Sequence, residues 1–265
     1  MLVPELDEVE LGRRWDSEGC VLLRQALSKA SVAAARDAMH GFLLRAANVP
    51  GTADDAARAV TETHNRIHNS PTAAPPAPIA ALRDDPALAK IAHVLLGGPV
   101  APLSVVWLRA RGARDFQRTS SPHCDAPYVG GHTDGFCTFW IPLQPVSAAD
   151  GTMIVMPRSH KSARLAAYAG SDLLGGDGAL RMGAGYCHHP DDASADLQLP
   201  WWTAEFEVGD ILAFRPNLLH AAVDNMGQQL RCSVDVRLAR RELSAPGFWS
   251  SPAPVDFDGY FMDAQ

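Results

Sequence analysis

The 265-residue chain is predicted to form one mainly β domain, a sandwich or barrel of antiparallel strands with helices on its N-terminal side. Its length suits one large domain with helical additions. A hydrophobic fraction of 47% and a charged fraction of 20% are typical of a globular protein with a full core. We therefore take residues 1–265 as a single unit, with a mostly helical part over 1–100, a β core over 101–240 and a C-terminal extension over 241–265.

The first hundred residues favour helix. The stretch 28–44 is rich in helix formers and begins at Ser28, a good N-cap residue. Residues 70–79 are rich in proline and alanine and break the pattern. A second helix is expected over 81–96, where Gly97, Gly98 and Pro99 would end it.

From about residue 101 the sequence changes to short apolar runs that are bounded by turn residues. Evenly spaced short strands of this kind indicate an antiparallel sandwich or barrel. The eight expected strands are Leu103–Ala110, Ser121–Asp125, Phe136–Leu143, Thr152–Met156, Ala204–Glu207, Ile211–Phe214, Leu218–Val223 and Leu230–Leu238. Residues 161–202 are less regular, and an insertion of this length is expected to be a lid or binding loop.

The net charge and the cysteine content indicate which kinds of partner and which cellular compartment to expect. A net charge of −7 and a pI near 5.8 argue against nucleic acid or an anionic membrane as the partner. The five cysteines are odd in number and lack CxxC spacing, which predicts a reduced, cytoplasmic setting. The charged opening segment does not resemble a secretion signal, and no apolar run is long enough to cross a bilayer. Formation of a homo-oligomer is left open.

A His-x-Asp triplet stands out in the segment from Ser121 to Tyr128. On a strand, positions i and i+2 point to the same face, so His123 and Asp125 would point the same way while Cys124 points away. One imidazole and one carboxylate side by side make two thirds of the two-histidine, one-carboxylate set that binds non-haem iron. The third ligand must come from another strand that faces the same cavity.

His220 is the candidate third ligand, and Arg231 is expected beside it. Residues 224–227 suit a hairpin turn, and a hairpin symmetric about them would put His220 and Arg231 directly opposite one another. A guanidinium at that place can bind a carboxylate through two hydrogen bonds. A metal with an arginine one strand away is the arrangement that a chelating keto-diacid needs.

Two alternatives stay open. A single His-x-Asp triplet is a weak signal, and a histidine on a strand is more often a satisfied polar residue than a ligand. The triplet of His132 and Asp134 fits the same pattern, although its position after Gly130 and Gly131 suggests a turn or loop. We favour His123 and Asp125 because they lie on a predicted strand.

These residues together resemble the phytanoyl-CoA dioxygenase family, a branch of the oxygenases that depend on Fe(II) and 2-oxoglutarate. The resemblance covers about residues 101–240 closely and the helical part loosely. Four landmarks carry it in order: His123–Asp125, the tract from Thr138 through Asp150-Gly151 to His160, the strand Gly209–His220, and Arg231 eleven residues later. The resemblance implies a double-stranded β-helix core, that is, a jelly roll or cupin-like fold with flanking N-terminal helices.

The resemblance also implies a chemistry. His123, Asp125 and His220 would bind Fe(II), Arg231 would bind the cosubstrate 2-oxoglutarate, and O2 would be the oxidant. Thr138 is a further candidate contact of 2-oxoglutarate if its side chain points inward, and a core residue otherwise. Two positions depart from the family pattern: Arg158 replaces the glycine of a tight turn, and Ala222 stands where many members have a serine near the cosubstrate.

The expected function is therefore a dioxygenase that hydroxylates an unactivated C–H bond of a small metabolite, such as a natural-product intermediate or an amino-acid derivative, with release of succinate and CO2. The alternatives are a non-hydroxylating outcome of the same chemistry, namely desaturation, cyclisation or epimerisation, and a metal-binding cupin-like module without catalysis.

Overall fold

The structure is a computed structural model that describes residues 7–48, 50–52, 55–57, 60, 69–116, 119–173, 185–243 and 249. Its α-helices are α1 (Glu8–Glu18), α2 (Lys29–Ala46), α4 (Ala77–Arg83), α5 (Pro86–Leu96), α6 (Ala163–Ala169) and α7 (Pro190–Leu197). Its strands are β1 (Cys20–Leu23), β2 (Asn69–Thr72), β3 (Val100–Pro102), β4 (Val106–Arg111), β5 (Phe136–Pro142), β6 (Met153–Val155), β7 (Ile211–Phe214), β8 (His220–Ala222) and β9 (Arg231–Arg240).

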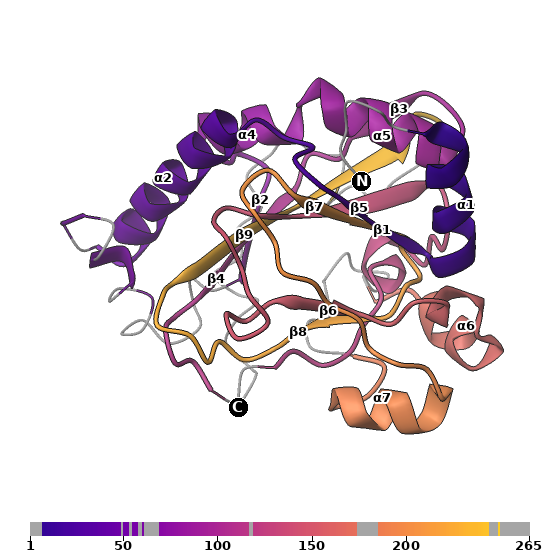
Figure 1. The fold of residues 1–265 in the computed structure, drawn as a ribbon. Helices are drawn as coiled ribbons and strands as arrows, with labels where there is room; N and C mark the ends of the chain where they lie inside the picture. Colours follow the sequence, from indigo (N-terminus) through magenta and orange to yellow (C-terminus); the bar gives the residue numbers. More distant parts are fainter. Residues whose placement is uncertain are drawn as a thin grey trace.

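Two antiparallel sheets form the core of the molecule (Figure 1). The large sheet has seven strands in the order β1-β7-β5-β9-β4-β2, and β3 pairs with β9. The small sheet pairs β6 with β8, and single bridges widen it on both sides, from Val155 to Trp202 and from His220 to His123. Six of the eight expected strands are present, as β4, β5, β6, β7, β8 and β9. The expected strands Ser121–Asp125 and Ala204–Glu207 are wrong as strands, because they form only single bridges at His123 and Phe206, and Asp125 begins a short turn. The predicted jelly-roll core with flanking helices is confirmed.

The large sheet separates two environments. Helices α2, α4 and α5 lie over its outer face, and the small sheet faces its other side (Figure 1). Strand β9 shows the division residue by residue. Cys232, Val234, Val236 and Leu238 belong to the apolar core under the helices, while the alternating residues Arg231, Ser233, Asp235 and Arg237 face inward, toward the small sheet. Both sets are buried, so the polar side chains of β9 lie between the sheets.

The helix expected over 81–96 is wrong as a single element. The chain forms α4, which ends before Asp84, and then begins α5 at Pro86. Asp85 takes an extended conformation and its side chain accepts a hydrogen bond from the Ala87 amide. Asp followed by Pro is a favourable N-cap and N1 pair, so it starts a new helix. The helix predicted from Ser28 is confirmed as α2, with Ser28 as its cap.

The hairpin expected between His220 and Arg231 is also wrong. Strand β8 pairs with β6, whereas β9 pairs with β3, β4 and β5, so the two residues lie in different sheets. The connection between the strands crosses from one sheet to the other. Buried Asn225 secures this crossing, because its side-chain amide donates to the carbonyls of Gly112 and Gln229 at 2.8 Å each. The turn residues at 224–227 therefore lie where the chain passes from the small sheet to the large sheet.

The insertion over 161–202 contains α6, α7 and the extended segment that bridges to β6. Residues 174–184 lie outside the described residues, and a lid role remains a prediction. None of the helices that the structure describes is long and apolar enough to span a membrane.

Candidate metal centre

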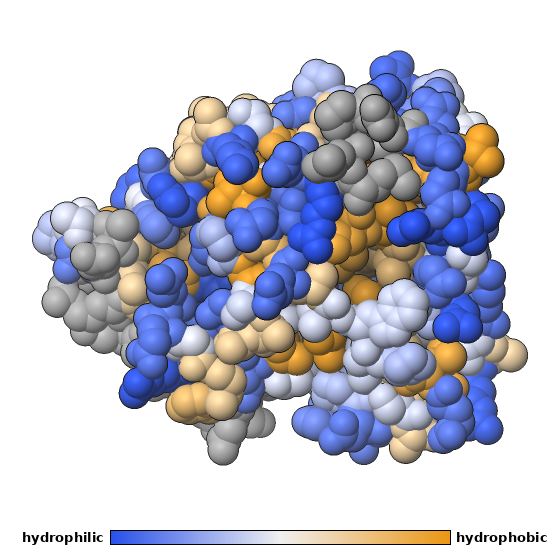
Figure 2. Space-filling view, in the orientation of Figure 1, coloured by the Kyte–Doolittle hydropathy of each residue, from blue (hydrophilic) through white to orange (hydrophobic). Residues whose placement is uncertain are grey.

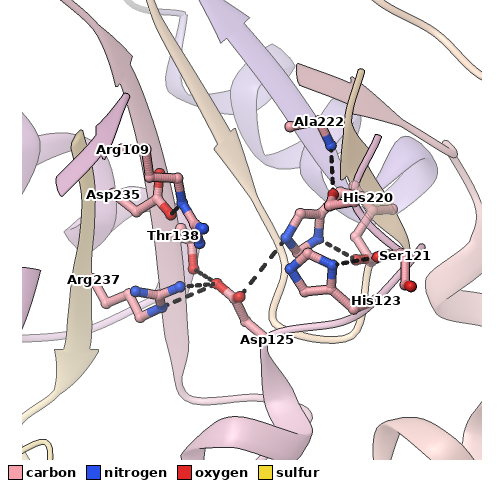
Figure 3. A network of polar contacts seen from close by, with 11 residues as sticks. Arg109, Ser121, His123, Asp125, Thr138, His220, Ala222, Asp235 and Arg237 are labelled. Atoms are coloured by element: carbon pink, nitrogen blue, oxygen red, sulfur yellow. Dashed lines mark hydrogen bonds and ion pairs between the residues drawn. The ribbon is translucent and has the colours of Figure 1, made fainter. Parts of the chain in front are cut away.

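Two neighbouring segments of the small sheet supply three side chains that converge on one point. His123 and His220 form an antiparallel bridge, in which each backbone amide donates to the other residue's carbonyl at 3.0 and 2.9 Å. Asp125 follows two residues after His123, at the start of a short turn. The ligand atoms of the three residues all lie within 4.8 Å of one another (Figure 3). Among the described residues this is the group of histidine, cysteine and acidic side chains that could hold a metal.

Each histidine is oriented by a backbone carbonyl. Nδ1 of His123 lies 2.8 Å from the Ser121 oxygen, and Nδ1 of His220 lies 3.1 Å from the Leu218 oxygen. A carbonyl only accepts hydrogen bonds, so Nδ1 carries the proton in both rings. The lone pair of each neutral imidazole is then on Nε2, which is the ordinary arrangement of a metal-binding histidine.

Asp125 is fixed through one of its two carboxylate oxygens. Oδ2 accepts hydrogen bonds from Thr138 Oγ1 at 2.5 Å and from Arg237 Nε and Nη2 at 3.0 and 2.8 Å (Figure 3). Oδ1 points toward His220, 3.7 Å from its Nε2. The large sheet therefore holds one oxygen of Asp125, and the other faces the two imidazoles.

The protonation states suit a cation. Burial lowers the pKa of His123 to about 3 and also lowers that of His220, so both rings are neutral near pH 7. Burial alone would raise the pKa of Asp125, but the nearby Arg237 guanidinium and the Thr138 hydroxyl hold it well below its usual range. Two neutral nitrogen donors and one carboxylate are the ligands that non-haem Fe(II) takes on one face, with the other positions open. The donor set fits iron.

Arg231 is a buried cation at the start of β9 in the large sheet, and it does not lie opposite His220, which belongs to the small sheet. It is 2% exposed, and its Nη1 donates to Ser233 Oγ at 2.8 Å while Nε has no partner. Among the described residues no carboxylate forms an ion pair with it. Burial and the neighbouring Arg111 lower its pKa to about 9. A buried guanidinium without a counter-charge is costly unless an anion binds there.

Arg237 is the residue of the site that the sequence analysis missed. It is 3% exposed and faces Thr138 across the β5–β9 pair. A signal was available: polar residues alternate with apolar ones along the whole of 231–238, as expected of a strand with one polar face. A charged side chain on a central, fully buried strand almost always has a partner, and this one pairs with Asp125.

The other candidates lie elsewhere or have a different contact. Asp134 is exposed on the surface, 4.0 Å from Arg215, and His132 and Asp134 are not part of the converging group. The hydroxyl of Thr138 points to Asp125, so a contact with 2-oxoglutarate remains a prediction. His160 lies against Gly19 and the end of α1, which agrees with a structural role.

A cavity of about 160 Å³ opens onto His123, Asp125 and Arg237. Three aromatic side chains, Trp107, Tyr128 and Trp249, form part of its other walls, together with Arg109, Ser120, Ser121 and Gly185. Trp249 belongs to the C-terminal extension; its ring lies over the Arg237 guanidinium at 4.9 Å, and its Nε1 donates to the Tyr128 carbonyl. The C-terminal extension therefore contributes to this wall at Trp249, and residues 244–248 and 250–265 lie outside the described residues.

A jelly roll with two histidines and one aspartate converging inside it defines the class of oxygenases that depend on Fe(II) and 2-oxoglutarate. The comparison with family models specifies the class further. Residues 15–233 match the model "Phytanoyl-CoA dioxygenase (PhyH)", and the chain belongs to this family. It is an oxidoreductase.

Known relatives agree with this assignment. The chain is 28% identical over 252 residues to 1-deoxypentalenic acid 11-beta-hydroxylase of Streptomyces exfoliatus, covering 89% of this chain and 82% of the relative. It resembles the fold of EctD from S. alaskensis, solved with 2-oxoglutarate and 5-hydroxyectoine, with TM-score 0.67, 18% identity and coverage of 94% and 81%. It also resembles the epimerase SnoN, solved with Fe3+, alpha ketoglutarate and nogalamycin RO, with TM-score 0.59, 20% identity and coverage of 88% and 83%.

Proposed function

We propose that this protein hydroxylates an unactivated C–H bond of a small metabolite, using Fe(II), 2-oxoglutarate and O2 and releasing succinate and CO2. The observation that carries the proposal is the convergence of His123, Asp125 and His220 beside a cavity large enough for a compact substrate. When bound there, iron supplies the oxidation of the C–H bond with O2 and 2-oxoglutarate as co-reactants. The chain supplies binding, orientation and exclusion of water.

Arg231 is proposed to bind the distal carboxylate of 2-oxoglutarate. The support is its burial, its lack of a carboxylate partner among the described residues, and its free Nε. A dicarboxylate that reaches from the metal to Arg231 would supply the missing counter-charge. Arg111 lies opposite Arg231 in the β4–β9 register and adds positive charge at the same end of the sheet. Ala222 gives no hydroxyl here, so the arginines carry this interaction.

Asp125 is proposed to favour hydroxylation over halogenation, because a carboxylate occupies the position that a halide takes in related halogenases. Arg237 and Thr138 keep this carboxylate ionised and fixed. The aromatic walls of the cavity, Trp107, Tyr128 and Trp249, suit a compact, largely apolar substrate. The hydroxylase among the relatives acts, by its name, on 1-deoxypentalenic acid, which agrees with a small natural-product intermediate.

A non-hydroxylating outcome is the second candidate, and the fold's likeness to the epimerase SnoN supports it. Product mass separates the two. Hydroxylation adds one oxygen atom to the substrate, whereas desaturation or cyclisation removes two hydrogens and epimerisation leaves the mass unchanged.

The first test is binding and turnover of the cosubstrate. The purified protein should bind 2-oxoglutarate under anaerobic conditions when loaded with Fe(II), and should release succinate slowly in air with ascorbate present. A protein that binds the metal but neither binds nor turns over 2-oxoglutarate would instead be the metal-binding cupin-like module without catalysis. Calorimetry gives the binding and chromatography gives the succinate.

We also propose that the protein works in a reduced cytoplasm on a small molecule and not on nucleic acid or a membrane. All five cysteines are free of disulfides, and the net charge is −7. Size-exclusion chromatography with light scattering tests whether it forms a homo-oligomer.

A further inference from the structure

A second cavity, of about 220 Å³, lies between the sheets and shares no lining residue with the cavity at His123. Figure 2 shows a hollow on this face beside α1 and β1, lined by apolar side chains and edged by hydrophilic ones. Its walls come from β1, β6, β7 and the segment 202–206. The apolar wall residues on which the argument depends are Cys20, Leu22, Val155, Ala204 and Leu212.

The chemistry of this cavity does not suit a charged or strongly polar ligand. Its polar lining residues are Arg14 and Glu18 of α1 and Thr203. Arg14 forms an ion pair with Glu10 at 2.6 Å, Glu18 forms a longer one with Arg158 at 3.3 Å, and the Thr203 hydroxyl donates to the Met153 carbonyl. The thiol of Cys20 stays neutral, because burial raises its pKa to about 12. An apolar cavity offers water few hydrogen bonds, and such cavities take up small apolar molecules, including xenon.

The inner wall of this cavity touches the metal centre. Val155 lines it and pairs directly with His220 across the β6–β8 ladder, so the two side chains lie next to each other on the inner face. Leu212 also lines it, and Phe214, two residues later on the same face of β7, lies with its ring 4.6 Å from the His220 ring. Val155 therefore borders both the cavity and His220, and Phe214, next along β7 from the cavity-lining Leu212, packs against the His220 ring.

We propose that this cavity is an entry and holding site for O2, which reaches the metal centre past Val155 and Phe214. The inference rests on the proposed function, because it takes O2 to be a reactant. Of the three molecules the reaction needs, O2 is the small apolar one. The 2-oxoglutarate needs the cationic end of β9, and the substrate needs the aromatic cavity at His123. A separate apolar path lets O2 arrive after 2-oxoglutarate and substrate have both bound.

The first experiment tests whether the cavity takes up a small apolar gas, and it does not depend on a measurement of enzyme activity. Crystals of the full chain are pressurised with xenon, and anomalous density is expected inside the walls formed by Leu22, Val155 and Leu212. Xenon found only in the cavity at His123 would overturn the proposal. So would clear density for a lipid or for a chain segment in this cavity, since either would block the path.

The second experiment closes the cavity. Ala204 lines it and is not part of the metal centre, so Ala204→Trp fills the space with an indole. The expected result is a KM for O2 raised several-fold and loss of the xenon density, with unchanged affinity for 2-oxoglutarate. Ala34→Trp, at an exposed position on α2, is the matched control and should leave the KM for O2 unchanged.

The two proposals fail in different ways. If Ala204→Trp fills the cavity in its crystal structure and binds 2-oxoglutarate normally, an unchanged KM for O2 overturns the O2 path alone. If the unsubstituted protein does not bind 2-oxoglutarate anaerobically, the proposed function falls and the O2 path falls with it. The xenon experiment keeps the proposal testable if Ala204→Trp does not fold.

Discussion

Asp125 is the residue at which the two sheets meet. Its backbone belongs to the segment beside the small sheet, while its Oδ2 is held by Arg237 and Thr138 of the large sheet. The ion pair with Arg237 is nearly inaccessible to solvent, with both side chains 3% exposed. Removing one partner from such a pair leaves an uncompensated charge in the interior.

We expect Arg237→Met to lower the free energy of unfolding of the metal-free protein by roughly 3–5 kcal/mol. Adding Asp125→Asn should recover part of this loss, because the buried charge is then gone. Urea denaturation of the two single variants and the double variant gives the coupling energy. A loss under about 1 kcal/mol, the usual value of an exposed ion pair, would mean that water reaches the pair in solution.

Arg231→Met is expected to weaken binding of 2-oxoglutarate by roughly 3 kcal/mol, or about a hundredfold in Kd, because a buried charge pair loses one partner. Anaerobic calorimetry on the Fe(II)-loaded protein measures this. Arg13→Met makes the same chemical change at an exposed residue of α1 and is the control. An equal effect in both variants would rule out the anchoring role.

Prediction from the sequence worked best for residues whose spacing along the chain determines how close their side chains lie. The His-x-Asp triplet could be found because its two side chains are only two residues apart, which keeps them close in space. His220 was found through the family resemblance, since the hairpin expected between it and Arg231 does not form. Arg237 was missed because its partner is more than a hundred residues away, and only the sheet register brings Thr138, Arg237 and Asp125 together. The alternation of polar and apolar residues in β9 was present in the sequence and would have pointed to it.

At the scale of elements, six strands of the β core were predicted near their observed positions, whereas β1, β2, β3 and the connections between strands were not predicted. Apolar runs between turn residues identified the strands, since each strand's burial is a local property. Whether two consecutive strands form a hairpin depends on the other sheet, and β8 and β9 join different ones. The division between α4 and α5 could have been predicted from the sequence, because Asp85 followed by Pro86 is a favourable N-cap and first-turn pair.

The turn after β6 contains a residue in an unfavourable conformation. Arg158 has φ 69°, in the left-handed region, where the family pattern has a glycine. A non-glycine side chain there costs roughly 1–2 kcal/mol of stability. Replacing it by glycine removes this cost, but the greater freedom of glycine in the unfolded chain offsets part of the gain.

We therefore expect Arg158→Gly to raise the free energy of unfolding by up to about 1 kcal/mol. Arg158→Ala is the matched variant: it also removes the contact with Glu18 but keeps a Cβ, so it should not stabilise. Thermal and urea denaturation compare the two. Equal stabilities would show that the turn relaxes around the side chain.

At the scale of the whole molecule, a bound metal would strengthen the contact between the sheets. His123 and His220 belong to the small sheet, and Asp125 is tied to the large one. A cation held by all three links the layers through Asp125. Because the triad exists only in the folded state, metal binding should add to stability by mass action.

Binding of Fe(II) under anaerobic conditions is expected to stabilise the fold by about 2.7 kcal/mol at a free concentration one hundred times Kd. The rise in Tm should disappear on chelation and should be absent in His123→Ala and His220→Ala. Differential scanning fluorimetry measures it, with Arg158→Gly as a variant that retains the metal response. A full response in both histidine variants would mean that the metal binds elsewhere.

Trp249 has a practical consequence for experiments on this protein. Its indole covers Arg237 and donates a hydrogen bond to the Tyr128 carbonyl at the cavity wall. Proteolysis that removes Trp249 during purification would open that wall and alter which molecules the enzyme accepts. Substrate screens should therefore use material that is intact through Trp249, with intact mass checked before each assay.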